Sequence, residues 1–329
     1  MARPKKIYMV TDTETATLPF VDEIAFGDPD IRKSIAIARP LVYDIGWILM
    51  YRDGTVIVKR QYLVAEIFSV AKIFNTAYYK EKRPIYLDML ARGEIKVKTW
   101  NEIMKIFMED MANADYVGAF NSMFDFKKAI PFTELYVKKL YSADYQAWEN
   151  SQKNLCKRIA TGNNKKNPHF DGEHFSFRGV ECELFDIWGM ACKHLLNRVS
   201  YKEMCLEYGM LTNSGEFFKS SAESAYRFLK NYFDFEEAHT ALADAEIEGQ
   251  ILSKILAHHA VTVGIEFFPF RQLGYTDEFV MRKKRPNLEH VQTIYDAMDK
   301  YIGDDEELSR YKVKIRRKMD RLEEVMGLE

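Results

Sequence analysis

Carboxylates and one histidine recur in three short patterns of this chain that could bind metal ions. The residues are Asp12, Glu14, Asp125, His239 and Asp244. Hard divalent cations prefer oxygen ligands, and carboxylates supply them. Two such ions about 4 Å apart suit in-line attack on a phosphodiester. If these side chains converge, the sequence predicts a site for two Mg²⁺ or Mn²⁺ ions.

The first pattern places two carboxylates at the end of a strand. Asp12 and Glu14 follow the apolar run Ile7–Val10, which is typical of a buried strand. Because successive strand residues face opposite ways, Asp12 and Glu14 share one face. Ligands bind at the carboxyl ends of strands in open α/β sheets. Taken alone, an Asp-x-Glu pair is most often a solvated strand end.

The second pattern follows another apolar run, Tyr116–Phe120, and opens a segment with helical spacing. Asn121 or Ser122 could cap that helix through a side-chain oxygen. Asp125 would then lie in the first turn, where the helix dipole favours a carboxylate. Both roles are structural, so this pattern alone does not separate structure from chemistry.

The third pattern combines the histidine with the last carboxylate. Residues 241–256 have helical spacing, and Asp244 lies early among them. His239 is five residues earlier, about 140° round an ideal helix, so the two side chains could not face one point within a helix. We therefore expect His239 in the loop before the helix, where it could act as a base; a lone surface histidine is the alternative.

The order of these residues resembles the DEDDh branch of the 3′→5′ exonucleases, the proofreading-type or DnaQ-like family, over roughly residues 5 to 260. The resemblance implies that Asp12, Glu14 and Asp244 bind two metal ions. It also implies that Asp125 supports the second ion through water and that His239 takes a proton from the attacking water. A histidine with an ordinary pKa near 6.5 suits that role near neutrality.

Two positions bear on the match to this branch. A sister branch has tyrosine where this chain has Thr240, so the histidine branch fits better. Many members have histidine where this chain has Phe120, a departure that we do not expect to affect catalysis.

Composition is that of a globular enzyme. The chain has 329 residues, of which 47% are hydrophobic and 14% aromatic, enough for a sizeable core. The four cysteines show no C-x-x-C pairing, so neither a zinc site nor a disulfide framework is expected. Only four apolar residues precede the first motif and no run approaches membrane-spanning length, so we expect a cytoplasmic protein.

The net charge of −2 is low for a protein that binds phosphates, which usually recruit Lys and Arg. Local basic runs occur at Arg282–Arg285 and between Asn150 and His169. Gly162 and Pro168 predict that the second run is a loop near the site; the alternative is solvated surface. The substrate-contact hypothesis covers Thr15, Asn121, Phe124, Lys153, Lys157, Arg158, Lys165 and Lys166.

The predicted elements alternate between strands and helices. Strands are expected at 5–12, 41–51, 56–64, 115–120 and 180–186, with a hairpin turn at Arg52–Gly54. Helices are expected at 65–82 (ending at Arg83-Pro84), 99–112, 122–140, 200–208, 221–231 and 241–256. Thr99 and Glu102 form a plausible capping box. Three antiparallel strands followed by alternating helices and strands indicate an α/β mixed sheet flanked by helices, the layout of the ribonuclease H-like fold that the resemblance implies.

Two regions stand apart from this layout. Residues 142–178 form an insertion-like stretch within an exonuclease domain predicted at 1–265. Residues 266–329 form a mostly helical C-terminal extension, whose stretch Leu308–Met326 has amphipathic spacing. That helix would either pack on the domain or bind a protein partner.

The sequence therefore predicts a metal-dependent 3′→5′ exonuclease, on DNA rather than RNA and on single-stranded ends. An exoribonuclease or oligoribonuclease of the same family is the nearest alternative, because the motifs do not report the sugar. A nucleic-acid-binding protein that keeps the fold without catalysis is the alternative from another class.

Overall fold

The computed structural model describes residues 5–162, 174–283 and 316. A mixed seven-stranded sheet lies at its centre, in the order β4-β3-β2-β1-β5-β7-β6. The strands are β1 (Ile7–Ala16), β2 (Leu41–Tyr51), β3 (Val56–Val64), β4 (Lys96–Lys98), β5 (Tyr116–Ala119), β6 (His174–Phe177) and β7 (Val180–Asp186). β1, β5 and β7 are parallel neighbours, so their carboxyl ends meet at one edge of the sheet.

Helices occupy most of the connections. Between β1 and β2 lie α1 (Val21–Ala25) and α2 (Pro29–Ala38). Between β3 and β4 lie α3 (Ala65–Phe68), α4 (Ala71–Phe74), η1 (Lys80–Lys82) and α5 (Arg83–Ala91). The middle of the chain holds α6 (Trp100–Ala112), α7 (Ser122–Phe124), η2 (Asp125–Ala129), α8 (Ile130–Leu140) and α9 (Tyr145–Ala160). After β7 come α10 (Ile187–Ala191), η3 (Cys192–Leu196), α11 (Val199–Glu207), α12 (Ala222–Lys230), α13 (Ala241–Leu256), η4 (Pro269–Leu273) and α14 (Thr276–Lys283).

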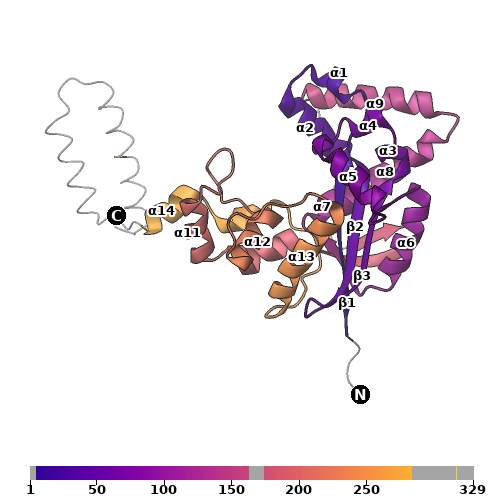
Figure 1. Ribbon diagram of the computed structural model, residues 1–329. Helices are drawn as coiled ribbons and strands as arrows, with labels where there is room; N and C mark the ends of the chain where they lie inside the picture. The colour runs from indigo at the N-terminus through magenta and orange to yellow at the C-terminus, as the bar shows by residue number, and fades with distance from the viewer. Residues whose placement is uncertain (1–4, 163–173, 284–315, 317–329) are drawn as a thin grey trace, which may run out of the picture. The chain divides into compact units, whose positions relative to one another are not determined.

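The two faces of the sheet are covered by different helices. Gly46 and Trp47 are neighbours on β2 and therefore face opposite ways. A Cβ at Gly46 would lie 2.3 Å from the backbone nitrogen of Leu242, so α13 covers that face. The ring of Trp47 meets Phe107 of α6 at 5.1 Å, so α6 covers the other. Figure 1 shows α13 and α6 on either side of β1, β2 and β3.

Several elements match their sequence signals closely. β2, β3, β7 and α13 have the predicted bounds. The Arg52–Gly54 turn joins β2 to β3 as expected. Thr99 and Glu102 form the predicted capping box at the start of α6. Local signals, namely apolar or alternating runs, a turn and paired capping side chains, therefore predict these elements well.

Other expectations were wrong. The helix predicted at 65–82 is three short helices, and Pro84 lies in the first turn of α5 rather than ending a helix. Proline has no N–H to lose there, because first-turn N–H groups lack helical partners. The helix predicted at 122–140 contains the π-helical turn η2.

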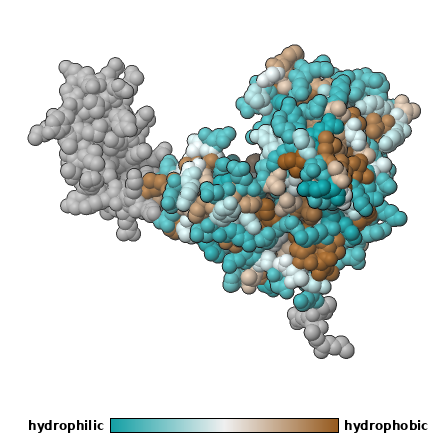
Figure 2. All heavy atoms as spheres, viewed as in Figure 1, coloured by the Kyte–Doolittle hydropathy of each residue, from teal (hydrophilic) through white to brown (hydrophobic). Residues whose placement is uncertain are grey.

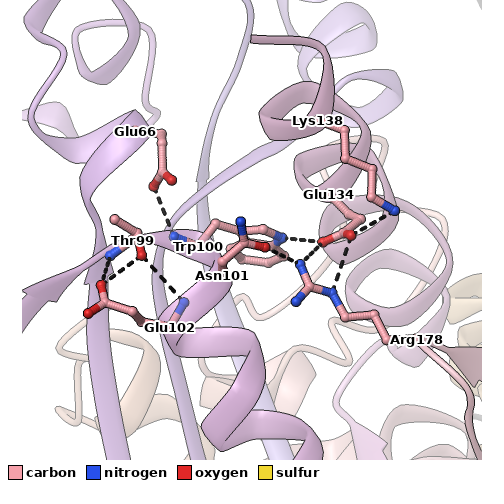
Figure 3. A network of polar contacts seen from close by, with 8 residues as sticks. All are labelled: Glu66, Thr99, Trp100, Asn101, Glu102, Glu134, Lys138 and Arg178. Atoms are coloured by element: carbon pink, nitrogen blue, oxygen red, sulfur yellow. Dashed lines mark hydrogen bonds and ion pairs between the residues drawn. The ribbon is translucent and has the colours of Figure 1, made fainter. Parts of the chain in front are cut away.

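A network of polar contacts lies at the start of α6 (Figure 3). Glu134 of α8 is 6% exposed and accepts hydrogen bonds from the Trp100 indole at 2.7 Å and from the Arg178 guanidinium at 2.6 Å. Burial favours the neutral acid, but the bonds from Arg178, Lys138 and Trp100 hold the pKa of Glu134 below its ordinary value. The network therefore joins α6, α8 and the β6–β7 turn.

The chain divides into two compact units. The first runs from the N-terminus to Leu211 and from Lys219 to Leu273, and contains the whole sheet. Among the described residues, the second contains Thr212–Phe218 and Gly274–Lys283. Within it the Thr276 hydroxyl donates to the Gly215 carbonyl at 2.6 Å. The amphipathic stretch Leu308–Met326 lies outside the described residues, apart from Arg316.

The surface in view is mostly hydrophilic and is broken by several hydrophobic patches (Figure 2). Among the described helices, none combines the length and the apolar content that crossing a bilayer requires.

Candidate metal and catalytic site

Asp12 and Glu14 lie within β1, on the face that α13 covers, and not at the end of the strand as predicted, because pairing with β2 continues the strand to Ala16. Asp12 is paired in register with Gly46 of β2, and paired residues of antiparallel strands point to the same face. Because Gly46 has no side chain, the start of α13 approaches β2 closely there. Both carboxylates keep partial exposure. The first motif therefore points at the N-terminus of the helix that carries the third.

Asp244 lies in the first turn of α13, and His239 lies in the loop before it, as predicted. Thr240 makes no side-chain cap. Instead Asp44 of β2 accepts from the Ala241 backbone N–H at 3.0 Å and fixes the start of the helix. His239 has φ of 51°, a left-handed conformation that turns the chain into α13.

Glu14, His239 and Asp244 come together in the fold. One ligand atom from each lies within 4.8 Å of the other two. The three residues come from β1, from the loop and from α13, so tertiary structure assembles this group. Together, the three side chains could hold a single cation.

Asp125 is buried, at 4% exposure, and opens the π-helical turn η2 after β5. The Thr13 hydroxyl of β1 donates to its Oδ1 at 2.5 Å. Asp125 is also among the carboxylates whose repulsion raises the pKa of Asp12, so the second motif lies close to the first.

The predicted cap of this helix is wrong. Neither Asn121 nor Ser122 accepts a capping hydrogen bond from it. The Ser122 hydroxyl donates to the Phe185 carbonyl at 2.6 Å and accepts from the Ala119 N–H at 2.8 Å. Asn121 has φ of 151°, an uncommon value for a residue with a Cβ. Tertiary contacts to β7 replace local capping at this turn.

Three further carboxylates surround the motifs. Glu248 follows Asp244 by one helical turn, is 4% exposed and accepts from the Phe120 N–H at 3.1 Å. Glu237 precedes His239, and its Oε2 lies 3.8 Å from the histidine Nδ1. Asp44 is fully buried, is paired in register with Glu14, and adds to the repulsion on Glu14 and Asp244. The spacing of four between Asp244 and Glu248 was a signal in the sequence, whereas Asp44 sits inside an apolar strand run that gave none.

Burial and mutual repulsion raise the pKa of these acids. Burial, followed by repulsion from Glu248, Asp244 and other carboxylates, raises the pKa of Asp12 well above its ordinary range. Burial is also the main cause that raises the pKa of Asp125 and of Asp244 to about 7 each. For Glu237, burial and then Asp244 raise the pKa to about 8. A cluster of this kind favours either protons or bound cations.

The donor set fits hard divalent cations. Asp244 Oδ1 and Glu237 Oε1 are buried and have no hydrogen-bond partner in the described structure. Carboxylate oxygens are the ligands that Mg²⁺ and Mn²⁺ prefer. Asp12, Glu14 and Asp244 would hold such ions, with Asp125 and Glu248 as neighbouring charges.

The segment before α5 supplies an aromatic ring and a cation that sequence reasoning missed. Tyr79 stacks on the His239 ring with centroids 4.2 Å apart and an angle of 16°. Lys82 donates to the Ala238 carbonyl, and its charge lowers the pKa of Glu14 and Asp244. Burial and then Lys82 lower the pKa of His239. The imidazole therefore stays neutral, and able to accept a proton, to lower pH than usual.

The remaining substrate-contact hypotheses have mixed outcomes. The loop expected from Lys153 is wrong up to Ala160: Lys153, Lys157 and Arg158 lie on α9. This helix packs through Trp148, Gln152 and Cys156, a spacing of four that the basic residues obscured. Lys153 is engaged with Glu149. Lys165 and Lys166 lie outside the described residues.

Thr15 and Phe124 remain near the carboxylates. Thr15 follows Glu14 at a shift of register between β1 and β2. Phe124 directly precedes Asp125 and packs partly buried against the core. Neither position by itself shows contact with a substrate.

No protein family, curated protein or solved structure that we compared with this chain matches it.

Proposed function

We propose that this chain is a metal-dependent 3′→5′ exonuclease. The observation that carries the proposal is the convergence of carboxylates from three distant segments, at residues 12–14, 125 and 244, beside a histidine. Folding places these repelling acids together at a cost, which a purely structural role would not require. Bound cations would offset that cost.

The architecture also supports the proposal. A seven-stranded mixed sheet flanked by helices is compatible with the ribonuclease H-like fold that the sequence resemblance implies. Asp12 and Glu14 lie in the second half of β1, and Asp125 follows the carboxyl end of β5, the end of the strands at which open α/β sheets bind ligands.

The position of His239 beside the carboxylates supports a role as general base. Its ring is stacked on Tyr79 and lies within reach of Glu14 and Asp244. In the proposed reaction it accepts a proton from the water that attacks the terminal phosphodiester. Bound Mg²⁺ or Mn²⁺ would supply compensation for the negative charge that develops on the phosphate. The 3′ oxygen of the preceding nucleotide leaves, and the terminal nucleotide is released as a monophosphate.

The sugar of the substrate depends on contacts with the 2′-OH, so we keep the exoribonuclease as the second substrate hypothesis.

End-labelled oligonucleotides test this proposal. DNA and RNA strands, each blocked at the 3′ or the 5′ end, are incubated with Mg²⁺ or Mn²⁺. We expect stepwise shortening from free 3′ ends and none from blocked ones. Absence of cleavage with both metals, on both nucleic acids, would leave the non-catalytic binding protein as the better hypothesis.

Substitution of the carboxylates tests the site itself. Asp12→Asn, Glu14→Gln and Asp244→Asn each remove a cation ligand with little change of shape, so we expect cleavage to fall to background at saturating metal. Glu246→Gln is the matched control, because Glu246 lies on the same helix and pairs with Lys59. Near-wild-type turnover in any of the three site variants would contradict the assignment.

A further inference from the structure

The segment before α5 has an exposed aromatic side chain that packing does not explain. Tyr78 is 76% exposed, although its neighbours Ala77 and Thr76 are buried and hold the backbone in place. The ring of Tyr79 lies 4.8 Å from it, nearly perpendicular at 88°. A single exposed ring is ordinary on a protein surface, so its neighbours decide whether it can bind a ligand.

This ring lies next to the candidate site. Tyr79 contacts Tyr78 on one side and stacks on His239 on the other, and His239 lies within 4.8 Å of Glu14 and Asp244. A continuous path of side chains therefore leads from the carboxylates to the exposed ring. All of these residues belong to the unit that contains the sheet.

The same segment carries positive charge. Lys80 is exposed, and the Lys82 ammonium lies 5.3 Å from the centre of the Tyr79 ring. These cations stand beside a site that is otherwise crowded with carboxylates. Aromatic rings next to cations are the combination that binds single-stranded nucleic acid, since bases stack on the rings while the phosphates meet the positive charge.

We propose that Tyr78 stacks on the unpaired base of the terminal nucleotide while the scissile phosphate lies among the carboxylates. This inference rests on the proposed function and specifies its substrate class. A base that stacks on Tyr78 must leave its partner strand, so the site takes a single-stranded end. Stacking is tolerant of sequence, because every base has a flat face.

Binding measurements with a modified end test this inference. Wild-type protein, Tyr78→Ala, Tyr78→Phe and Tyr141→Ala are titrated by fluorescence anisotropy against single-stranded DNA and RNA. A terminal phosphorothioate linkage slows hydrolysis during the titration. Each strand ends either in a complete nucleotide or in an abasic sugar phosphate. Tyr141 is the matched control, since it is 73% exposed and lies at the end of α8.

We expect Tyr78→Ala to weaken binding about 5- to 150-fold for the complete end, the range that one base–ring stack of roughly 1–3 kcal/mol corresponds to. With the abasic end this loss should disappear, because the partner of the ring is absent. Tyr78→Phe and Tyr141→Ala should bind like the wild type. Equal losses with both ends, or no loss with either, would overturn the inference.

The outcomes separate this inference from the proposed function. Cleavage by the wild type, with no effect of Tyr78→Ala on binding, contradicts the inference alone. End-dependent binding through Tyr78, without cleavage, contradicts the exonuclease and supports the base contact.

Discussion

At the scale of single residues, the raised pKa of Asp244 makes the stability of the metal-free fold depend on pH. The Asp244 carboxyl is 7% exposed, and burial followed by repulsion from Asp44 raises its pKa to about 7 despite the opposing charge of Lys82. In the unfolded chain the same group has a pKa near 4. Between these values the folded state binds more protons than the unfolded state, so stability falls as pH rises through this window.

We therefore expect the stability of the metal-free protein to decrease from pH 5 to 7 and to change little from this group above. One proton contributes a slope of about 1.4 kcal/mol per pH unit. Asp244→Asn should have a shallower slope, and exposed Asp88→Asn should keep the wild-type slope. Denaturant unfolding at several pH values, in the presence of a metal chelator, measures the slope of stability against pH. A variant whose slope equals that of the wild type would show that Asp244 is ionised throughout.

His239 is the second residue with a measurable signature. His239→Ala should lower turnover by roughly 10²–10⁴-fold, the usual contribution of a general base. Because burial and Lys82 lower the pKa of His239, the acid limb of the wild-type pH–rate profile should lie below the ordinary histidine value. Turnover across pH and Mn²⁺ titration calorimetry measure the two effects. Collapse of metal affinity with normal turnover at saturating metal would make His239 a ligand and not a base.

Sequence reasoning was effective for residues with local signals and weak for those that depend on tertiary contact. The patterns around Asp12, Asp125 and Asp244 led to side chains that the fold brings close together. Asp44 escaped notice because nothing in Leu41–Tyr51 shows that its carboxylate would meet the Ala241 N–H. Tyr79 escaped for the same reason, since its partner His239 lies far along the chain.

At the scale of elements, the contact between β2 and α13 determines where the third motif lies. A Cβ on Gly46 would meet backbone atoms of Ala241 and Leu242 at 2.3 to 2.6 Å, and backbone cannot rotate away. A Cβ on Gly249, farther along α13, would meet the ends of the flexible side chains of Ile48 and Met50. Gly46 and Gly249 lie at the same interface between β2 and α13. An added side chain should be tolerated at Gly249 better than at Gly46.

We expect Gly46→Ala to displace the start of α13 and with it Asp244 and His239. Overpacking of this kind costs about 1–3 kcal/mol, and the loss of activity should exceed what unfolding explains. Gly249→Ala should be close to neutral, since alanine favours the helix by roughly 0.5–1 kcal/mol. Thermal melts and cleavage rates of both variants test the comparison. Equal effects of the two substitutions would mean that α13 adjusts freely at either point.

The elements that sequence analysis missed have weak or mixed patterns. α9 has only a narrow buried stripe, at Trp148, Gln152 and Cys156, on an otherwise polar surface. α1 has five residues, too few for a periodicity of 3.6 to be visible, and for the same reason α3 and α4, with four residues each, were predicted as one longer helix. Long apolar strands such as β2 had no such ambiguity.

At the scale of the whole molecule, every residue of the candidate site belongs to the unit with the sheet. We expect a chain ending at Leu273 to retain cleavage within about twofold, because no site residue is removed. Thr212–Phe218 would lose the contacts that Gly215 makes with Thr276 and that Phe217 makes with Tyr275. Limited proteolysis should therefore cut this segment faster in the shortened chain. Loss of cleavage in a folded truncated protein would assign the second unit a role in the reaction.

The packing of α13 on β1 and β2 has a consequence for synthesis of the protein. Translation proceeds from the N-terminus, so both strands leave the ribosome long before the helix that covers them. Until then the sheet face that carries Ile48 and Met50, as well as the site carboxylates, has no native partner, and exposed apolar side chains favour aggregation. Contacts between segments far apart in the chain also form slowly. The nascent chain should thus depend on chaperones at this stage, and the group Glu14, His239 and Asp244 cannot form until α13 docks.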